Sequence, residues 1–225
     1  MNPVKARLAK VLLVITTFAT LGTSLAQTGW TEVFRETFGE GAHPLYLFGG
    51  VLQFGPRQDT PFITLSRGGS LEIINETDPN YIRYYFIEPR HVSGWFQAPE
   101  SLTRVSVKVS GQFGEFPGAG LVYRLDPTNH SFYAFVLTGG NGYGLYARDN
   151  GVYQAVFTDT SNLITPGSPT TLTIDGSGND LNLYINGSHV NTVQVSRTTG
   201  IGVGIIAAGT GTYYFDDYII ELGGR

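Results

Sequence analysis

Apolar and polar positions alternate in short runs over the second half of the chain, from residue 118 to residue 220. Each run is too short for a helix and ends at residues that favour turns, among them Asp126-Pro127 and Asn186-Gly187. Because Gly and Asn adopt the positive φ angles of hairpin turns at little steric cost, this spacing predicts antiparallel hairpins. The predicted strands are 118–125, 131–138, 143–148, 171–175, 181–185 and 201–207.

The first half of the chain is less regular but predicts further strands. Residues 102–109 alternate cleanly, and the other strand-like segments are 30–38, 50–54, 70–74 and 81–87. No stretch has the apolar period of an amphipathic helix, and no linker or repeat divides the chain. Short strands at this spacing are typical of antiparallel sandwiches. We therefore predict an all-β, two-sheet antiparallel jelly-roll sandwich in a single domain.

The run from residue 181 to residue 185 shows how one strand can present two different faces. Leu181, Leu183 and Ile185 alternate with Asn182 and Tyr184. Because successive side chains of a strand point to opposite faces, the apolar set packs inward. The other face presents an amide and a phenol.

The first 26 residues are predicted to be a leader that is not part of the fold. A basic start with Lys5, Arg7 and Lys10 is followed by a mostly apolar run, and small residues stand at Ser24 and Ala26. This order is typical of a secretory signal peptide cleaved after residue 26. The apolar run is about half the length of the roughly 20 residues that span a membrane. We expect residues 27–225 to form the secreted domain, extracellular or periplasmic, without membrane insertion after cleavage.

Composition limits the classes of partner. The chain contains no Cys, so disulfides and thiolate metal sites are excluded and the fold must rest on its core. Loss of the three leader cations takes the formal net charge from −4 to about −7. An acidic domain without a basic cluster argues against nucleic acid as a partner.

Five segments together resemble the concanavalin A-like lectin/glucanase superfamily. They are residues 34–38, 120–124, 131–135, 181–187 and 214–218. Within that superfamily the chain is most similar to laminin G-like modules and to the 3-keto-disaccharide hydrolase domains of secreted bacterial proteins. The resemblance implies two packed antiparallel sheets of six or seven strands, a fold often used to hold glycans. Together with the predicted leader, it leads us to expect a secreted, lectin-like monomer whose partner is a glycan or polysaccharide.

The carboxylates give little support for catalysis. Glycoside hydrolysis generally uses two carboxyl groups about 5–10 Å apart, and on a strand these would be acids two residues apart. The only such pair, Glu76 and Asp78, lies beside Pro79 in a predicted turn, and the adjacent Asp216 and Asp217 should point to opposite faces. We expect a non-catalytic protein. The alternatives are a glycoside hydrolase of the 3-keto-disaccharide hydrolase type and a structural or adhesion module of the cell envelope.

Aromatic and arginine side chains are the predicted contacts to sugar. Sugar rings have apolar C–H faces and hydroxyl rims, which suit stacking rings together with fork-like donors. The candidate carbohydrate-binding residues are Arg124, Tyr133, Tyr143, Tyr146, Arg148 and Trp95. A one-residue slip in strand register reverses the face that each side chain occupies. If Leu125 pairs with Ser131, Tyr123 and Tyr133 share a face; if it pairs with Phe132, Arg124 and Tyr133 do.

One structural Ca²⁺ ion is expected where the first and last strands meet. Glu36 lies on the first predicted strand and Asp217 on the last, residues 214–220, and carboxylate and carbonyl oxygens suit Ca²⁺. Alternation places Asp217 on the same face as Phe215 and Ile219, where its charge needs a hydrogen-bond donor or a cation. The alternative is that Asp217 accepts backbone N–H groups.

Overall fold

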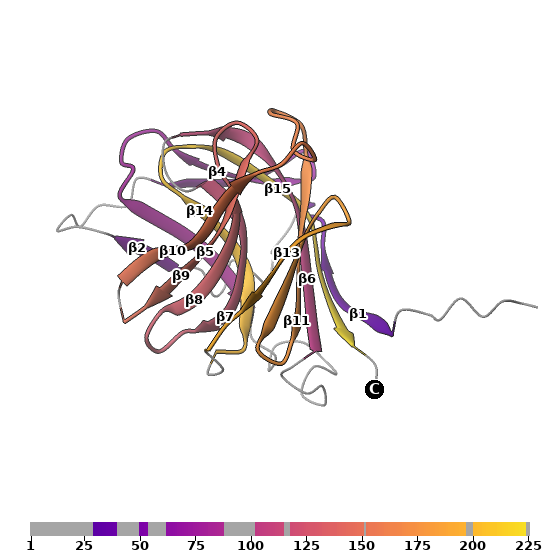
Figure 1. Ribbon diagram of the computed structural model, residues 1–225. Helices are drawn as coiled ribbons and strands as arrows, with labels where there is room; N and C mark the ends of the chain where they lie inside the picture. The colour runs from indigo at the N-terminus through magenta and orange to yellow at the C-terminus, as the bar shows by residue number, and fades with distance from the viewer. Residues whose placement is uncertain are drawn as a thin grey trace, which may run out of the picture.

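The computed structural model describes residues 29–39, 50–53, 62–87, 102–114, 118–150, 152–196 and 200–223. These residues form two antiparallel sheets that face each other, shown side by side in Figure 1. The predicted all-β, two-sheet sandwich is confirmed, whereas the predicted leader, residues 1–26, lies outside the described residues. In the part of the chain that is described, no helix is long and apolar enough to cross a membrane.

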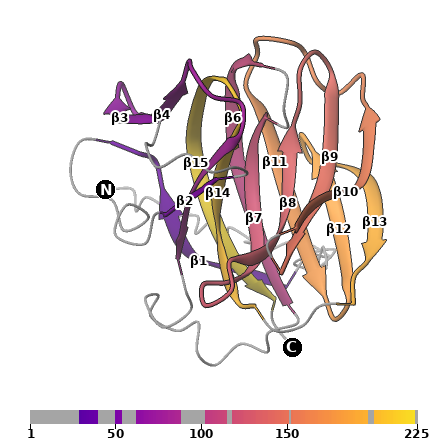
Figure 2. The same ribbon diagram turned by 90° about the vertical axis from the view of Figure 1, so that its left-hand side faces the viewer.

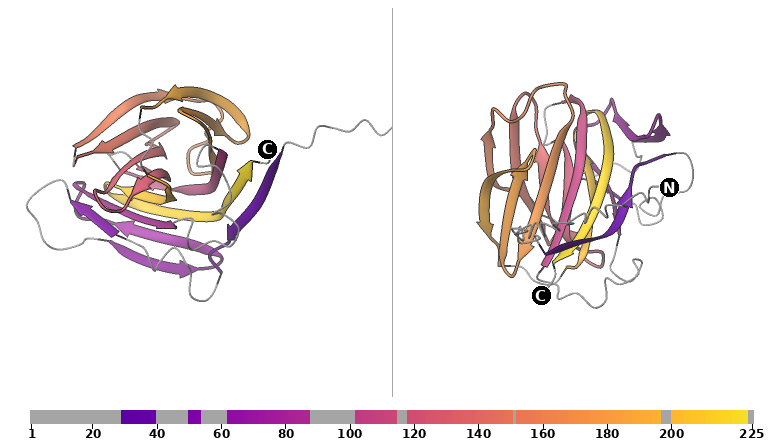
Figure 3. Two further views of the ribbon diagram at one scale, coloured as in Figure 1. Left: turned by 90° about the horizontal axis from the view of Figure 1, so that it is seen from below. Right: turned by 90° about the vertical axis from the view of Figure 1, so that its right-hand side faces the viewer.

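The two sheets contain eight and seven strands, compared with the six or seven in each that the resemblance implies. Sheet A has the order β13 (Ser188–Gln194), β12 (Asp180–Ile185), β11 (Thr170–Ser177), β6 (Leu102–Phe113), β15 (Gly211–Gly223), β4 (Ser70–Asn75) and β3 (Ile63–Arg67). Its eighth strand, β1 (Trp30–Glu36), pairs with β15, as both views of Figure 3 show. Sheet B, seen from outside in Figure 2, has the order β10 (Val152–Thr160), β9 (Gly142–Asp149), β8 (Ser131–Leu137), β7 (Gly118–Asp126), β14 (Gly202–Ala208), β5 (Tyr81–Ile87) and β2 (Gly50–Gln53).

The main core lies between the sheets and follows from the alternation along each strand. On β6, Val105, Val107 and Val109 are fully buried, whereas Arg104 and Ser106 point away from the core. Burial of one such side chain stabilises the fold by about 1.5–3 kcal/mol, before the cost in conformational entropy. The core contains more than thirty buried residues, so a domain without disulfides has a sufficient hydrophobic interior.

Sheet B is apolar on its outer face as well. A second cluster of buried residues there includes Tyr84, Phe132 and Tyr146. Tyr153 of the edge strand β10 covers part of it, since its ring stacks on Tyr146 with centroids 5.4 Å apart and lies 6.3 Å from the ring of Phe132. The two sheets therefore differ: sheet B buries both faces, and sheet A has a polar outer face.

Candidate functional site

Polar side chains form a row straight across the outer face of sheet A. Register places five of them on neighbouring strands from β15 to β13: Glu221, Arg104, Asp175, Asn182 and Thr192. Strands in a sheet lie about 4.8 Å apart, so these side chains are close enough to interact along the row. The row is an unbroken series of charges and hydrogen-bonding groups.

A second row runs parallel to the first, two residues away on four of the strands and three residues away on β13, where the register shifts. It consists of Ile219, Ser106, Thr173, Tyr184 and His189. Two residues of a strand span about 7 Å, so the rows are separated by roughly the width of a sugar ring. The outward position of Tyr184, predicted from the alternation of residues 181–185, is confirmed.

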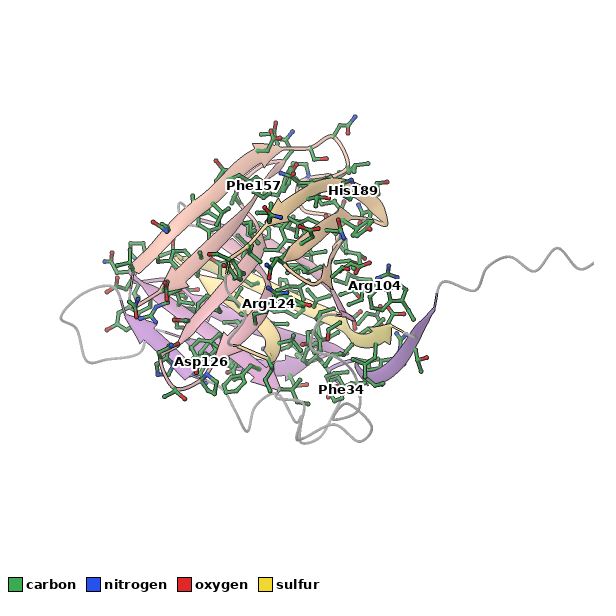
Figure 4. All side chains as sticks on the ribbon, turned by 60° about the horizontal axis from the view of Figure 1, so that its bottom comes forward. Phe34, Arg104, Arg124, Asp126, Phe157 and His189 are labelled. Atoms are coloured by element: carbon green, nitrogen blue, oxygen red, sulfur yellow. The ribbon has the colours of Figure 1, made fainter. Side chains whose placement is uncertain are left out.

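A groove of about 220 Å³ lies between the rows. It is lined by Arg104, Ser106, Thr173, Tyr184, Gly187 and Glu221. Figure 4 places Arg104 and His189 on the right-hand side of the molecule, and Arg124 nearer its centre. The groove therefore combines one aromatic ring, two hydroxyls, a guanidinium and a carboxylate on a face that is open to solvent.

Two contacts hold Arg104 in place. Its Nη2 donates to Asp175 Oδ2 at 2.9 Å, and its guanidinium carbon lies 4.3 Å from the centre of the Trp30 ring. A charge-assisted hydrogen bond and a cation–π contact together fix the plane of the guanidinium. Arg104 therefore presents its remaining donors in a defined direction.

The other end of the groove is ordered by a chain of hydrogen bonds. The rings of Tyr184 and His189 make an edge-to-face contact with centroids 5.3 Å apart. His189 Nε2 lies 2.9 Å from Thr192 Oγ1, and the Thr192 hydroxyl donates to Asn182 Oδ1 at 2.8 Å. Because that hydroxyl has one proton, His189 must donate from Nε2. This chain keeps the imidazole against the edge of the Tyr184 ring.

Three of the sequence-predicted sugar contacts lie inside the protein. Tyr133 and Tyr143 are 7% and 4% exposed and belong to the core between the sheets. Arg124 lies in a β-bulge with φ of 54°, is 7% exposed, and donates from Nη2 to the carbonyl oxygen of Gly178. Each of these three side chains therefore exposes less than a tenth of its surface.

The bulge at Arg124 also settles the two register alternatives. Tyr123 pairs with Tyr133, and the next pair joins Asp126 and Ser131. Tyr123 and Tyr133 therefore share the inner face. Neither predicted pairing of Leu125 occurs, because the bulge takes Arg124 and Leu125 out of the ladder with β8.

Two other predicted contacts lie on the outer face of sheet B. Tyr146 is 8% exposed and is stacked on Tyr153, and burial raises its pKa. Arg148 donates from Nη1 to the carbonyl oxygen of His130 at 2.7 Å, and burial lowers its pKa. Trp95 lies outside the described residues. The predicted set is therefore divided between two faces of sheet B, and contact of any member with sugar stays a prediction.

The predicted placement of Asp217 is wrong. Asp217 lies at a β-bulge with φ of 47°, which reverses the alternation of β15, so that Tyr218 and Ile220 point inward after Phe215. Its carboxylate accepts a 2.6 Å hydrogen bond from Lys108 Nζ and lies 3.8 Å from Arg35. The charge that was expected to need a hydrogen-bond donor or a cation thus has two cationic side chains beside it.

Calcium at Glu36 and Asp217 stays a prediction of the sequence. Glu36 Oε1 accepts a hydrogen bond from the backbone N–H of Phe38 at 2.7 Å. Among the described residues no group of three or more His, Cys, Asp or Glu side chains is placed to hold a metal ion.

Sequence reasoning did not assemble the groove, although each of its strands carries a signal. Alternation in residues 102–109 places Arg104 outward, and alternation in residues 181–185 does so for Tyr184. The missing information is which strands are neighbours and in which register, because β6 and β12 are joined only through β11.

Comparison with known proteins shows similarity at the level of the fold. A carbohydrate-binding module, CBM66 from Bacillus subtilis, aligns over 86% of this chain and 96% of its own, with a TM-score of 0.53 and 16% identity. The CBM2 module of the evolved Dit of Lactobacillus casei BL23 phage J-1 aligns over 88% and 97%, with a TM-score of 0.57 and 12% identity. A functionally unknown protein from Saccharomyces cerevisiae aligns over 80% and 98%, with a TM-score of 0.54 and 12% identity. No family model matches the sequence, and neither does a curated protein. The chain thus shares its sandwich fold with two carbohydrate-binding modules.

Proposed function

We propose that this protein is an exported carbohydrate-binding β-sandwich that holds a glycan in the groove of sheet A without cleaving it. The composition of the groove carries the proposal. The ring of Tyr184, the guanidinium of Arg104, the Glu221 carboxylate and the hydroxyls of Ser106 and Thr173 surround one open depression. These are the groups that match the apolar faces and hydroxyl rims of sugars.

The expected affinity is weak. If one sugar ring removes about 80 Å² of apolar surface from water, stacking contributes about 2 kcal/mol. Hydrogen bonds to Arg104 and the hydroxyls add a few kcal/mol, from which association costs are subtracted. A dissociation constant in the millimolar range corresponds to about 4 kcal/mol, and one groove can supply this.

Two further observations support binding without cleavage. Glu221 is the one acid among the described residues that line the groove, whereas glycoside hydrolysis generally uses two carboxyl groups. The neighbouring acids are each paired with a cation: Glu32, opposite Glu221 on β1, with Arg35, and Asp175 with Arg104. The two similar carbohydrate-binding modules support the proposal at the level of the fold.

A glycan array followed by calorimetry on residues 27–225 tests the proposal. We expect Tyr184→Ala to weaken binding of the best glycan at least about tenfold, because the stacking surface is lost. Tyr214→Ala is the matched control. Tyr214 is also a partly exposed tyrosine of sheet A, 38% exposed, but it does not line the groove, so affinity should be unchanged.

Three outcomes would count against the proposal. These are no binding to any glycan at millimolar concentration, equal losses in the two variants, and release of new reducing ends from the bound glycan. The last would favour the glycoside hydrolase.

A structural or adhesion module is favoured by a different observation, an exposed apolar patch at the edge of sheet A. Ile63 and Leu65 of β3 are 56% and 36% exposed. Leu65 and Tyr214 both pair with Glu72, so they lie in one row across β3, β4 and β15. Tyr214→Ala should then weaken binding to isolated cell envelopes, which Tyr184→Ala should leave unchanged.

Export is the remaining part of the proposal, and it rests on the signal-peptide pattern of residues 1–26. Expression of the full chain should yield a secreted product whose N-terminal residue is Gln27. A product that retains residues 1–26 would contradict it.

A further inference from the structure

The described cations of β1 and β6 on the outer face of sheet A each pair with an acid of the same face. The pairs are Arg104 with Asp175 at 2.9 Å, Arg35 with Glu32 at 2.6 Å, and Lys108 with Asp217 at 2.6 Å and Asp216 at 3.5 Å. Each positive charge is therefore compensated before a ligand arrives. An anionic sugar would have to compete with an existing ion pair for each of these three cations.

Glu221 differs from these acids. It lines the groove and is half-buried, and among the described residues it forms no ion pair. Register places it between Arg104 on β6 and Glu32 on β1, but Arg104 donates to Asp175 and Arg35 donates to Glu32. Glu32 is the main cause that raises the pKa of Arg35, and Glu221 contributes less. Glu221 is thus the acid of the groove that has no ion-pair partner among the described residues.

The position of Glu221 relative to Tyr184 sets the size of the ligand. Glu221 lies on β15 and Tyr184 on β12, three strands apart through β6 and β11. At about 4.8 Å per strand the two residues are separated by roughly 14 Å. One sugar ring cannot stack on Tyr184 and reach Glu221 at the same time, so the groove fits an oligosaccharide with at least two units.

We infer that the groove selects oligosaccharides of amino sugars over neutral ones and excludes acidic ones, with Glu221 as the residue that determines this preference. One unit stacks on Tyr184, and the ammonium group of another unit pairs with the Glu221 carboxylate. Charge-assisted hydrogen bonds are roughly twice as strong as neutral ones, and like charges repel a uronate or sulfate. The acidic balance of the mature chain acts in the same direction at long range. This inference rests on the proposed function of the groove.

Three oligosaccharides of equal length test the preference by calorimetry at one fixed pH. They are a glucosamine tetramer, its fully N-acetylated form and a galacturonate tetramer. We expect the glucosamine tetramer to bind at least about tenfold more tightly than the N-acetylated form. The galacturonate tetramer should bind more weakly than either. Added salt should reduce the difference.

Two variants assign the preference to Glu221. Glu221→Gln should raise the dissociation constant of the glucosamine tetramer to that of the N-acetylated form, whose own affinity should be unchanged. Glu76→Gln removes the same charge from an exposed turn. That turn follows Asn75, which pairs with Gly211 at the far end of β15, roughly 30 Å from Glu221 along the strand. This control should retain the full preference.

The outcomes separate the inference from the proposed function. Equal affinity for the aminated and acetylated tetramers, tightest binding of the galacturonate, or a preference that survives Glu221→Gln overturns the inference and leaves carbohydrate binding intact. If none of the three tetramers binds and no glycan of the array binds, both the inference and the proposed function are overturned.

Discussion

The backbone conformation of Asp217 determines which partner its carboxylate finds, and that partner is Lys108. The left-handed φ of Asp217 turns its carboxylate outward, where Lys108 lies between Asp216 and Asp217 and hydrogen-bonds to the latter. The hydrogen bond to Asp217 is the main cause that raises the pKa of Lys108. The ammonium therefore occupies the position beside Asp217 that a calcium ion would need.

Calcium should stabilise the Lys108→Met variant more than the wild-type domain. Removal of the ammonium leaves Asp216 and Asp217 as adjacent uncompensated charges, with Glu36 on the paired strand β1. A cation at a hundredfold excess over its dissociation constant stabilises by about 2.7 kcal/mol, or several degrees in melting temperature. Melting curves in calcium and in chelator measure this. If neither protein melts at a different temperature in calcium than in chelator, Glu36 and Asp217 are excluded as a metal site.

At the residue level the sequence predicts outward and inward positions until a bulge intervenes. Alternation correctly places Tyr184 on the outside and Leu183 in the core. It fails at Arg124 and Asp217, which are non-glycine residues with positive φ and carry no sequence signal comparable to Asn186-Gly187. A bulge depends on the twist and pairing of neighbouring strands, so local pattern does not contain it.

At the level of elements, the strands that sequence reasoning missed share one property. They are β3, β10 and β13, and each lies at the edge of a sheet. An edge strand buries few side chains, as β10 shows, with no buried residue along its length. The apolar period that identifies a strand is therefore weak there. Inner strands such as β6 and β11 bury alternate residues and were predicted.

The inner strand β14 contains a glycine where the backbone of the neighbouring strand β5 leaves no room for a side chain. A Cβ added at Gly204 would lie 1.9 Å from the carbonyl oxygen of Tyr85, whereas at Gly202 the nearest atom would be the Leu125 carbonyl oxygen at 3.1 Å. Gly204→Ala must therefore displace the backbone of β5, and we expect it to cost about 3 kcal/mol or more. Gly202→Ala should cost less than about 1 kcal/mol. Urea denaturation of both variants measures the difference, and equal stabilities would show that β14 and β5 can separate freely.

At the scale of the whole molecule, the location of the candidate site follows from whether the outer face of each sheet is buried or exposed to solvent. Sheet B buries an aromatic cluster there, in which Tyr146 stacks on Tyr153, whereas Tyr133 and Tyr143 lie in the core between the sheets. Sheet A leaves its charges and hydroxyls in solvent. The groove contains an aromatic ring and an arginine, the kinds of side chain that the sequence predicted for sugar contact, but they are Tyr184 and Arg104 and not the predicted residues. Local sequence does not specify which of the two sheets has a buried outer face.

Buried tyrosines connect the core to the behaviour of the whole domain in alkali. Burial raises the pKa of Tyr218 and of Tyr123 above the ordinary value of 10.0. A raised pKa of an acid means that the unfolded chain loses the proton first. This contribution to stability is therefore complete below about pH 10 and is lost as the pH rises toward the folded-state pKa.

The two tyrosines should respond differently to removal of the hydroxyl. Tyr123 donates to the Thr103 carbonyl oxygen at 2.9 Å, whereas the hydroxyl of Tyr218 is buried without a hydrogen-bond partner in the described part of the chain. An unpaired buried hydroxyl costs about 1–3 kcal/mol, so Tyr218→Phe should stabilise the domain at pH 8 and reduce the loss of stability between pH 8 and pH 11. Tyr123→Phe should also reduce that alkaline loss but should lower stability by about 1 kcal/mol at pH 8, because the Thr103 carbonyl loses its donor. Urea denaturation at the two pH values measures both effects. If Tyr218→Phe is less stable than the wild type at pH 8, the Tyr218 hydroxyl of the wild type has a hydrogen-bond partner in solution. That partner would be a water molecule or another group inside the core.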